Sequence, residues 1–219
     1  MANRLVFRER YINQNILNCL SRPQQRWGCS LAAITCVINY LYSHVLGIQT
    51  QEGIAKVLGL SSHDPGSPGN QELIDWFNQF TRKKRSGAAI HGTGEIKFHA
   101  DNIEPFSEVN EKVVRAIKNL VHSRRNILVY HLENHYNLVC GYFESAKEPT
   151  EAFSDDDPLL ERWIVLGDHY PLCDPVSSTR WRDIRADFLE DNRHCFILFS
   201  RPPTGRKQEA SARGAGTSR

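Results

Sequence analysis

The sequence predicts an α+β domain in which a helical N-terminal lobe packs on a mostly antiparallel sheet. Two observations support this. Apolar residues recur at steps of three and four through much of the first eighty residues, which is the period of helices with one buried face. Between residues 127 and 199, short runs of β-branched and aromatic residues alternate with turn-forming stretches, as in consecutive strands. Helices followed by grouped strands indicate the α+β class.

Three helices are expected in the N-terminal part, each with apolar side chains on one face. Loops rich in glycine, proline and serine separate them, because these residues favour turns over regular structure. Pro23 ends the segment that comes before the first helix and forces its predecessor toward extended geometry. In order, we expect an extended entry segment over residues 4–20, a helix from Cys29 to a stop at Gly47, a helix over residues 51–58 closed by Gly59, and a helix over residues 70–80 capped by Asn70.

The second part of the chain is expected to be richer in strands. A helix that starts at Ser107 and ends near Arg125 has acidic residues in its first turn and arginines in its last, which suits the helix dipole. An antiparallel hairpin and a third strand follow it. The expected strands cover residues 88–90, 96–98, 127–130, 138–143, 163–166 and 195–199, and a further helix begins at Thr179 and runs to Leu189.

The length and composition favour one globular domain. The chain has 219 residues, of which 40% are hydrophobic and 24% charged, enough apolar material for one sizeable core. We expect a single domain over residues 1–203. Residues 204–219 are polar and rich in glycine and serine, and we expect them to form a disordered tail.

The charge pattern excludes several classes of partner. A net charge of +2 is too small to predict a nucleic-acid or membrane surface, and the single basic run, residues 82–85, is expected to be a solvated loop. No segment is expected to span a membrane, and the N-terminus lacks the apolar core of a secretory signal peptide. The sequence therefore predicts an intracellular protein of the cytoplasm or the nucleus.

The six cysteines are expected to be reduced thiols. They have no secretion signal beside them, and the chain is larger than the small domains that depend on disulfides. No Cys-x-x-Cys pair occurs, so the sequence predicts neither a metal nor a cofactor.

Cys29 stands where a polar loop meets the longest apolar helix. The unpaired N–H groups and the positive dipole end of a helix start favour a thiolate, so we expect the pKa of this thiol to be lowered. Gln24 or Gln25, just upstream, offers an amide N–H₂ for an oxyanion that forms beside the sulfur. The alternative is an inert core cysteine, since free cysteines are among the most buried residues.

Two polar residues stand at the ends of predicted strands. His135 comes just before one strand, and Asp168 comes just after the strand over residues 163–166. From these positions a sheet presents an imidazole and the acid that orients it to a thiol on a facing helix. Asp174, in a later loop, competes for the acid's role. The alternatives are a hairpin histidine and an ordinary Gly-Asp turn.

The order glutamine, cysteine at a helix start, histidine at a strand start and acid at a strand end resembles that of papain-like cysteine peptidases, including their compact C39-like branch. Blocks within residues 8–201 also resemble the central region of the basic, immunoglobulin-like variable motif-containing protein family. That name suggests an immunoglobulin fold, which the predicted helices do not fit. The blocks are Cys-Leu-Ser-Arg-Pro-Gln at 19–24, Asn-Tyr-Leu-Tyr-Ser at 39–43, Thr-Gln-Glu at 50–52, Glu-Asn-His-Tyr at 133–136, Trp-Ile-Val-Leu-Gly-Asp at 163–168 and Trp-Arg-Asp-Ile at 181–184.

The papain-like resemblance implies a fold and a set of roles. It implies a papain-like fold with Cys29 as nucleophile, His135 as general base and acid, Asp168 as its orienting acid and Gln24 as oxyanion donor. Three functions stay open: a thiol hydrolase that cleaves a peptide or isopeptide bond in a protein, peptide or ubiquitin-like substrate, an acyltransferase or deamidase with the same residues, and a catalytically inactive relative that binds a protein partner.

Overall fold

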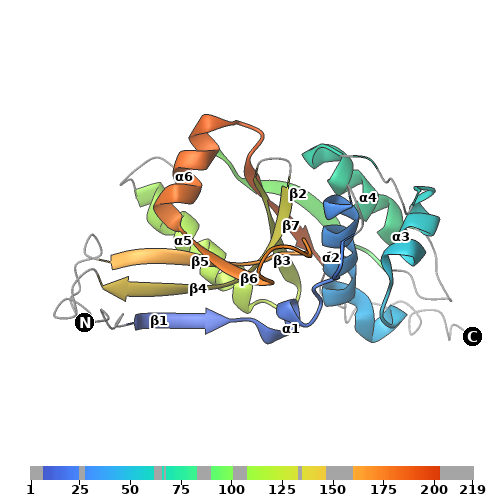
Figure 1. Cartoon of the computed structure of the whole chain (residues 1–219), viewed down its shortest axis with the longest axis horizontal. Coiled ribbons are helices and arrows are strands. Elements are labelled where there is room, and N and C mark those ends of the chain that lie inside the picture. Colours follow the sequence, from blue (N-terminus) through green and yellow to red (C-terminus); the bar gives the residue numbers. More distant parts are fainter. Residues whose placement is uncertain are drawn as a thin grey trace, which may run out of the picture.

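The structure is a computed structural model that describes residues 7–24, 28–61, 66, 68–82, 90–100, 108–132, 135–146 and 160–202. Its elements follow one another as helices first and strands later, with one strand at the start (Figure 1). In chain order they are β1 (Phe7–Ile12), α1 (Gln14–Leu17), α2 (Cys29–Leu46), α3 (Gln51–Leu58), α4 (Asn70–Arg82), β2 (Thr93–Phe98), α5 (Glu108–His122), β3 (Asn126–Leu132), β4 (His135–Ala146), β5 (Leu160–Gly167), β6 (Val176–Arg180), α6 (Trp181–Glu190) and β7 (Cys195–Ser200).

The strands form one sheet in which every described pairing is antiparallel, in the order β2-β7-β3-β4-β5-β6. The long strand β4 organises it. β3 pairs with the first half of one edge of β4, β1 pairs with the second half, and β5 covers the opposite edge. This is the predicted α+β class with its antiparallel sheet.

Helices cover both faces of the sheet, and the central strands are apolar on both sides as a result. On β3, Ile127 and Val129 face the core under α2, α3 and α4, whereas Leu128 and Tyr130 face the core under α5 and α6. Figure 1 shows the two helical groups on opposite sides of the strands. The expected helical lobe is therefore only one of two helical layers.

Helix α2 is the centre of the larger core. Most of its residues are buried, including Leu31, Ile34 and Ile38, and Gly47 ends it with a positive φ of 69°. At 18 residues and a mean hydropathy of 1.4, α2 is long and apolar enough to cross a membrane by those two criteria alone, contrary to the expectation that no segment would be. Its burial between the sheet and the neighbouring helices accounts for this composition.

The structure corrects the expected elements at three places. Residues 7–12 form a paired strand, and Gln14–Leu17 a short helix capped by the Asn13 side chain. The helix expected from Thr179 begins at Trp181 instead, because residues 176–180 pair with β5 as the edge strand β6. Ile90 lies outside any strand. The expected cap Ser107, most of the expected strand at 88–90 and the tail from 204 lie outside the described residues.

Gly141 gives a stability test of the way β1 closes on β4. A Cβ atom at this position would collide with the backbone of Tyr11 and Ile12, so Gly141→Ala should lower the free energy of unfolding by about 1–3 kcal/mol. Gly69→Ala is the matched control, because a Cβ there meets nothing within 4 Å. Urea denaturation of both variants measures the difference. Equal stability of the two would contradict the close packing of β1 on β4.

Candidate active site

The pairing of β4 with β5 brings two of the predicted site residues together. Leu138 of β4 is opposite Gly167 of β5, so the start of β4 and the end of β5 meet at the same end of the sheet. His135 is the first residue of β4, and Asp168 follows directly after β5. Helix α2 packs against β3 and β4 and begins with Cys29.

His135 and Asp168 are in direct contact. The Nε2 atom of His135 lies 3.0 Å from Oδ1 of Asp168, and the same oxygen accepts a hydrogen bond of 2.7 Å from the backbone N–H of Tyr170. An ionised carboxylate only accepts hydrogen bonds, so Nε2 carries the hydrogen. In the neutral ring Nδ1 is then the basic nitrogen, available to take a proton.

The geometry separates the two acids that the sequence left open. Hydrogen bonds hold both the side chain and the backbone of Asp168. Its backbone N–H donates to the carbonyl oxygen of Pro175 at 3.0 Å. Its side chain is only 15% exposed. Asp174 is exposed, and His135 has its carboxylate contact with Asp168. Asp168 is therefore the acid in contact with the imidazole, as expected.

Cys29 is partly buried, and its thiol faces the backbone N–H of Tyr136 on β4. Burial raises the pKa of the Cys29 thiol, and the negative charge of Asp168 adds to this, while the backbone N–H groups of Tyr136, Ser30 and Cys29 itself act in the opposite direction. The expectation of a lowered pKa is wrong. Removing a thiolate from water costs more here than the helix start and the nearby N–H groups offset.

Gln24 is joined to the same site through the backbone. The backbone N–H of Gln24 donates to the carbonyl oxygen of His169 at 3.1 Å, and His169 is the residue that follows Asp168. The side-chain Oε1 of Gln24 is buried and has no hydrogen-bond partner. An unmatched buried polar atom of this kind is uncommon and needs a functional or structural explanation. The competing Gln25 lies outside the described residues.

His169 is a buried histidine that the sequence analysis did not single out. Its ring is fully buried, with Nδ1 3.7 Å from the sulfur of Cys36 and with Nε2 lacking a partner. Burial lowers the pKa of His169 to about 3, and the nearby charge of His135 acts in the same direction. The ring is therefore neutral and supports the loop that carries Asp168. Its position directly after Asp168 is the feature of the sequence that could have pointed to it.

Tyr136 connects the site to the rest of the sheet. Its backbone N–H faces the Cys29 thiol, and its hydroxyl donates to the carbonyl oxygen of Pro68 at 2.9 Å. The imidazole of His131, on the paired strand β3, stacks on the Tyr136 ring with 4.6 Å between ring centroids. These contacts fix the strand that carries both His135 and Tyr136.

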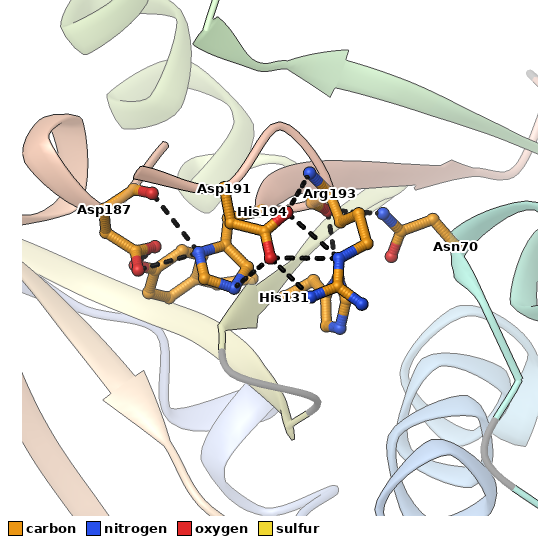
Figure 2. A network of polar contacts seen from close by, with 7 residues as sticks. Asn70, His131, Asp187, Asp191, Arg193 and His194 are labelled. Atoms are coloured by element: carbon orange, nitrogen blue, oxygen red, sulfur yellow. Dashed lines mark hydrogen bonds and ion pairs between the residues drawn. The ribbon is translucent and has the colours of Figure 1, made fainter. Parts of the chain in front are cut away.

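A polar network holds His131 in this stack (Figure 2). Nδ1 of His131 donates to the carbonyl oxygen of Arg193 at 3.1 Å, and Nδ2 of Asn70 donates to the same oxygen at 2.6 Å. Next to it, Nδ1 of His194 lies 2.8 Å from the carboxylate of Asp187. The network joins the start of α4, the end of α6 and the start of β7. Sequence spacing gave no signal for it, since its members come from distant segments.

Within the described part of the chain, no three His, Cys, Asp or Glu side chains converge in a way that could hold a metal ion. All six cysteines are free thiols. The residues around Cys29 thus offer a thiol, an imidazole, a carboxylate and amide groups as their chemistry.

Comparison with known proteins identifies the family. The model of the family described as "Basic immunoglobulin-like variable motif-containing protein" matches residues 1–216. The chain belongs to this family. The finding agrees with the blocks that the sequence analysis quoted.

Curated members of the basic immunoglobulin-like variable motif-containing protein family are similar over most of this chain. The human protein is 28% identical over 192 residues, which covers 80% of this chain and 36% of the human protein. The Xenopus tropicalis protein is 24% identical, covering 82% of this chain and 38% of that protein. The Giardia intestinalis protein is 21% identical, covering 94% of this chain and 82% of that protein. The chain thus spans little more than a third of the vertebrate relatives. No solved structure matches it.

The family's name mentions an immunoglobulin-like variable motif, whereas the described strands belong to one sheet with helices on both faces. An immunoglobulin domain packs two sheets face to face without such helical layers. The fold described for this member of the family is therefore different from the one the name suggests.

The raised pKa of Cys29 predicts how the thiols react with iodoacetamide. At neutral pH the exposed Cys173 should be modified first. In a Cys173→Ser variant the partly buried Cys19 and Cys29 should react next, each with a rate that rises steeply up to and beyond pH 9. Peptide mapping by mass spectrometry gives the order. Cys36, Cys140 and Cys195 should react last, because burial raises their pKa values and blocks access. Fast modification of Cys29 at pH 6 would instead indicate a resting thiolate.

His169 predicts a loss of stability in acid. Its pKa is about 3 in the folded protein, below the ordinary value of 6.5, so the unfolded chain binds its proton more tightly. The stability it contributes is complete above pH 6.5 and is lost as the pH falls toward 3. Between pH 7 and pH 5 the free energy of unfolding should fall by about 2 kcal/mol from this group. Denaturation of a His169→Gln variant at both pH values should show a fall in the free energy of unfolding that is smaller by this amount. The same fall as in the unmodified chain would contradict the lowered pKa of His169.

Proposed function

We propose that this chain is a papain-like cysteine hydrolase that cleaves a peptide or isopeptide bond in a protein, peptide or ubiquitin-like substrate. The observation that carries the proposal is the contact of 3.0 Å between His135 and Asp168. The Cys29 thiol lies close to this pair, since the backbone N–H of Tyr136 faces it and the charge of Asp168 acts on its pKa. A thiol at a helix start, an imidazole at a strand start and its orienting carboxylate form the arrangement used for nucleophilic catalysis by cysteine.

The proposed mechanism assigns one step to each group. His135 takes the thiol proton of Cys29 at Nδ1, and the thiolate attacks the substrate carbonyl carbon. The negative oxygen that forms is stabilised by the Cys29 backbone N–H and the Gln24 side-chain amide. His135 then gives the proton to the leaving amine. Water, activated by the same imidazole, hydrolyses the thioester and restores the thiol. Asp168 holds the imidazole in the correct tautomer and offsets its positive charge.

The raised pKa of Cys29 influences how this mechanism starts. Because burial keeps the thiol protonated, the nucleophile forms only when His135 removes the proton, rather than resting as a thiolate. Acyl transfer or glutamine deamidation would use the same residues and differ only in what attacks the acyl-enzyme.

A second candidate is a catalytically inactive relative that binds a protein partner through the surface around Cys29, and the raised pKa of Cys29 also favours it. A peptide vinyl sulfone and a ubiquitin vinyl sulfone separate the candidates. An enzyme should form a covalent adduct at Cys29 that is lost in Cys29→Ala. Binding without an adduct would favour the inactive relative. Six free thiols suit a reducing compartment, and we propose an intracellular location.

The role of Asp168 gives a quantitative test. Asp168→Asn should lower turnover by some hundreds to about ten-thousand-fold, because the amide no longer selects the productive tautomer of His135 or stabilises its charged form. Asp174→Asn is the matched control and should change turnover by less than about tenfold, since that exposed side chain has no part in the mechanism. Turnover is measured on the substrate found with the vinyl sulfone probes. The reverse ranking would transfer the role to Asp174.

A further inference from the structure

A pocket that does not include Cys29 lies beside the C-terminal half of α2. It has a volume of about 990 Å³, within the range of small-molecule sites. Tyr40 and His44, which line it, come 11 and 15 residues after Cys29 on the helix. At 1.5 Å per residue they lie about 16–22 Å along the axis from the thiol. The other walls are residues 18–23 and the segment that leads into α3.

Two arginines converge on one face of α2 in this pocket. The Tyr40 hydroxyl donates to the carbonyl oxygen of Ser123 at 2.6 Å, which brings the adjacent Arg124 to the pocket. Nη1 of Arg201 lies 2.5 Å from Nε2 and 3.2 Å from Nδ1 of His44, one helical turn further along. Both arginines therefore line the pocket beside the same helix face, although they come from the ends of α5 and β7.

The pocket has more positive than negative charge. A third arginine, Arg22, is held there by hydrogen bonds from Nη2 to the carbonyl oxygens of Tyr170 (2.7 Å) and Cys173 (2.9 Å). The lining contains one acid, Glu52. Among the described residues, none of the three arginines makes an ion pair with a carboxylate, whereas Arg162 and Lys118 do. Clustered guanidinium groups without acidic partners attract anions and suit phosphate or carboxylate geometry.

Gln51 holds one wall of the pocket in place. Its side chain lines the pocket and is 7% exposed. The Nε2 atom donates to Oγ of Ser21 at 2.9 Å and to the carbonyl oxygen of Pro23 at 3.2 Å. These hydrogen bonds join the start of α3 to residues 21–23, so this wall of the pocket is formed without a ligand.

We propose that this pocket binds a small anionic molecule whose phosphate or carboxylate contacts Arg124 and Arg201. Sugar phosphates and sugar acids are molecules of this kind. The three arginines in the lining supply the attraction for the anion. This site is independent of the proposed catalytic function, because it shares none of the four catalytic residues.

Calorimetric titration at low salt tests the proposal with glucose 6-phosphate, gluconate and glucose. At least one of the two anions should bind, and which one does distinguishes a phosphate ligand from a carboxylate ligand, while uncharged glucose should not bind. Arg124→Gln and Arg201→Gln should each weaken binding by about tenfold or more, the usual effect of losing a charge-assisted hydrogen bond.

Arg182→Gln is the matched control, because Arg182 is 57% exposed and faces Glu161 and Asp183 elsewhere on the surface. It should bind as the unmodified chain does, and so should Cys29→Ala. Circular dichroism and thermal unfolding verify that each variant folds. The proposal is overturned if neither anion binds with a Kd below about 5 mM, a free energy of roughly −3 kcal/mol. It is also overturned if Arg182→Gln weakens binding as much as the pocket variants do.

Discussion

The antiparallel pairing of β4 with β5 is the constraint on which the candidate active site depends. One strand starts where the other ends, so the first residue of β4 and the residue after β5 meet at a single sheet end. The bond between His135 and Asp168 is a direct consequence. Because a change of one residue in register would turn side chains to the opposite face, the buried apolar residues on both faces of these strands also fix the geometry of the polar pair.

Two opposing effects set the pKa of Cys29 at the start of α2. Its first turn supplies N–H groups that favour a thiolate at Cys29, but its burial in the core keeps water away from the sulfur. The second effect is larger, so the thiol depends on a base. The catalytic proposal therefore requires His135 to act before the attack, and the same raised pKa keeps a binding role for the site open.

The two ends of α2 have different chemistry. The N-terminal end faces a carboxylate and an imidazole, whereas the C-terminal half faces three arginines. Segment 18–24 runs between them, since residues 18–23 line the arginine pocket and the backbone N–H of Gln24 donates to the carbonyl oxygen of His169. A ligand in the pocket and a substrate at Cys29 would thus contact opposite ends of one short, well-anchored segment.

The sequence by itself determined much of the fold and the identities of the predicted site residues. The spacing of apolar residues located the helices that carry Cys29 and Asn70. It also located the strand that Asp168 follows and the strand near whose start His135 lies. Apolar spacing carries this information because it reflects which side chains are buried locally. Edge strand β6 was missed, since its residues are mostly exposed and leave no such pattern. Only the tertiary structure showed that Asp168 contacts His135, because that contact depends on strand register. The tertiary structure was also needed to show that the pKa of Cys29 is raised, that His169 is buried and that Arg22, Arg124 and Arg201 line one pocket. Burial and contact between distant segments follow from packing, which no local spacing encodes.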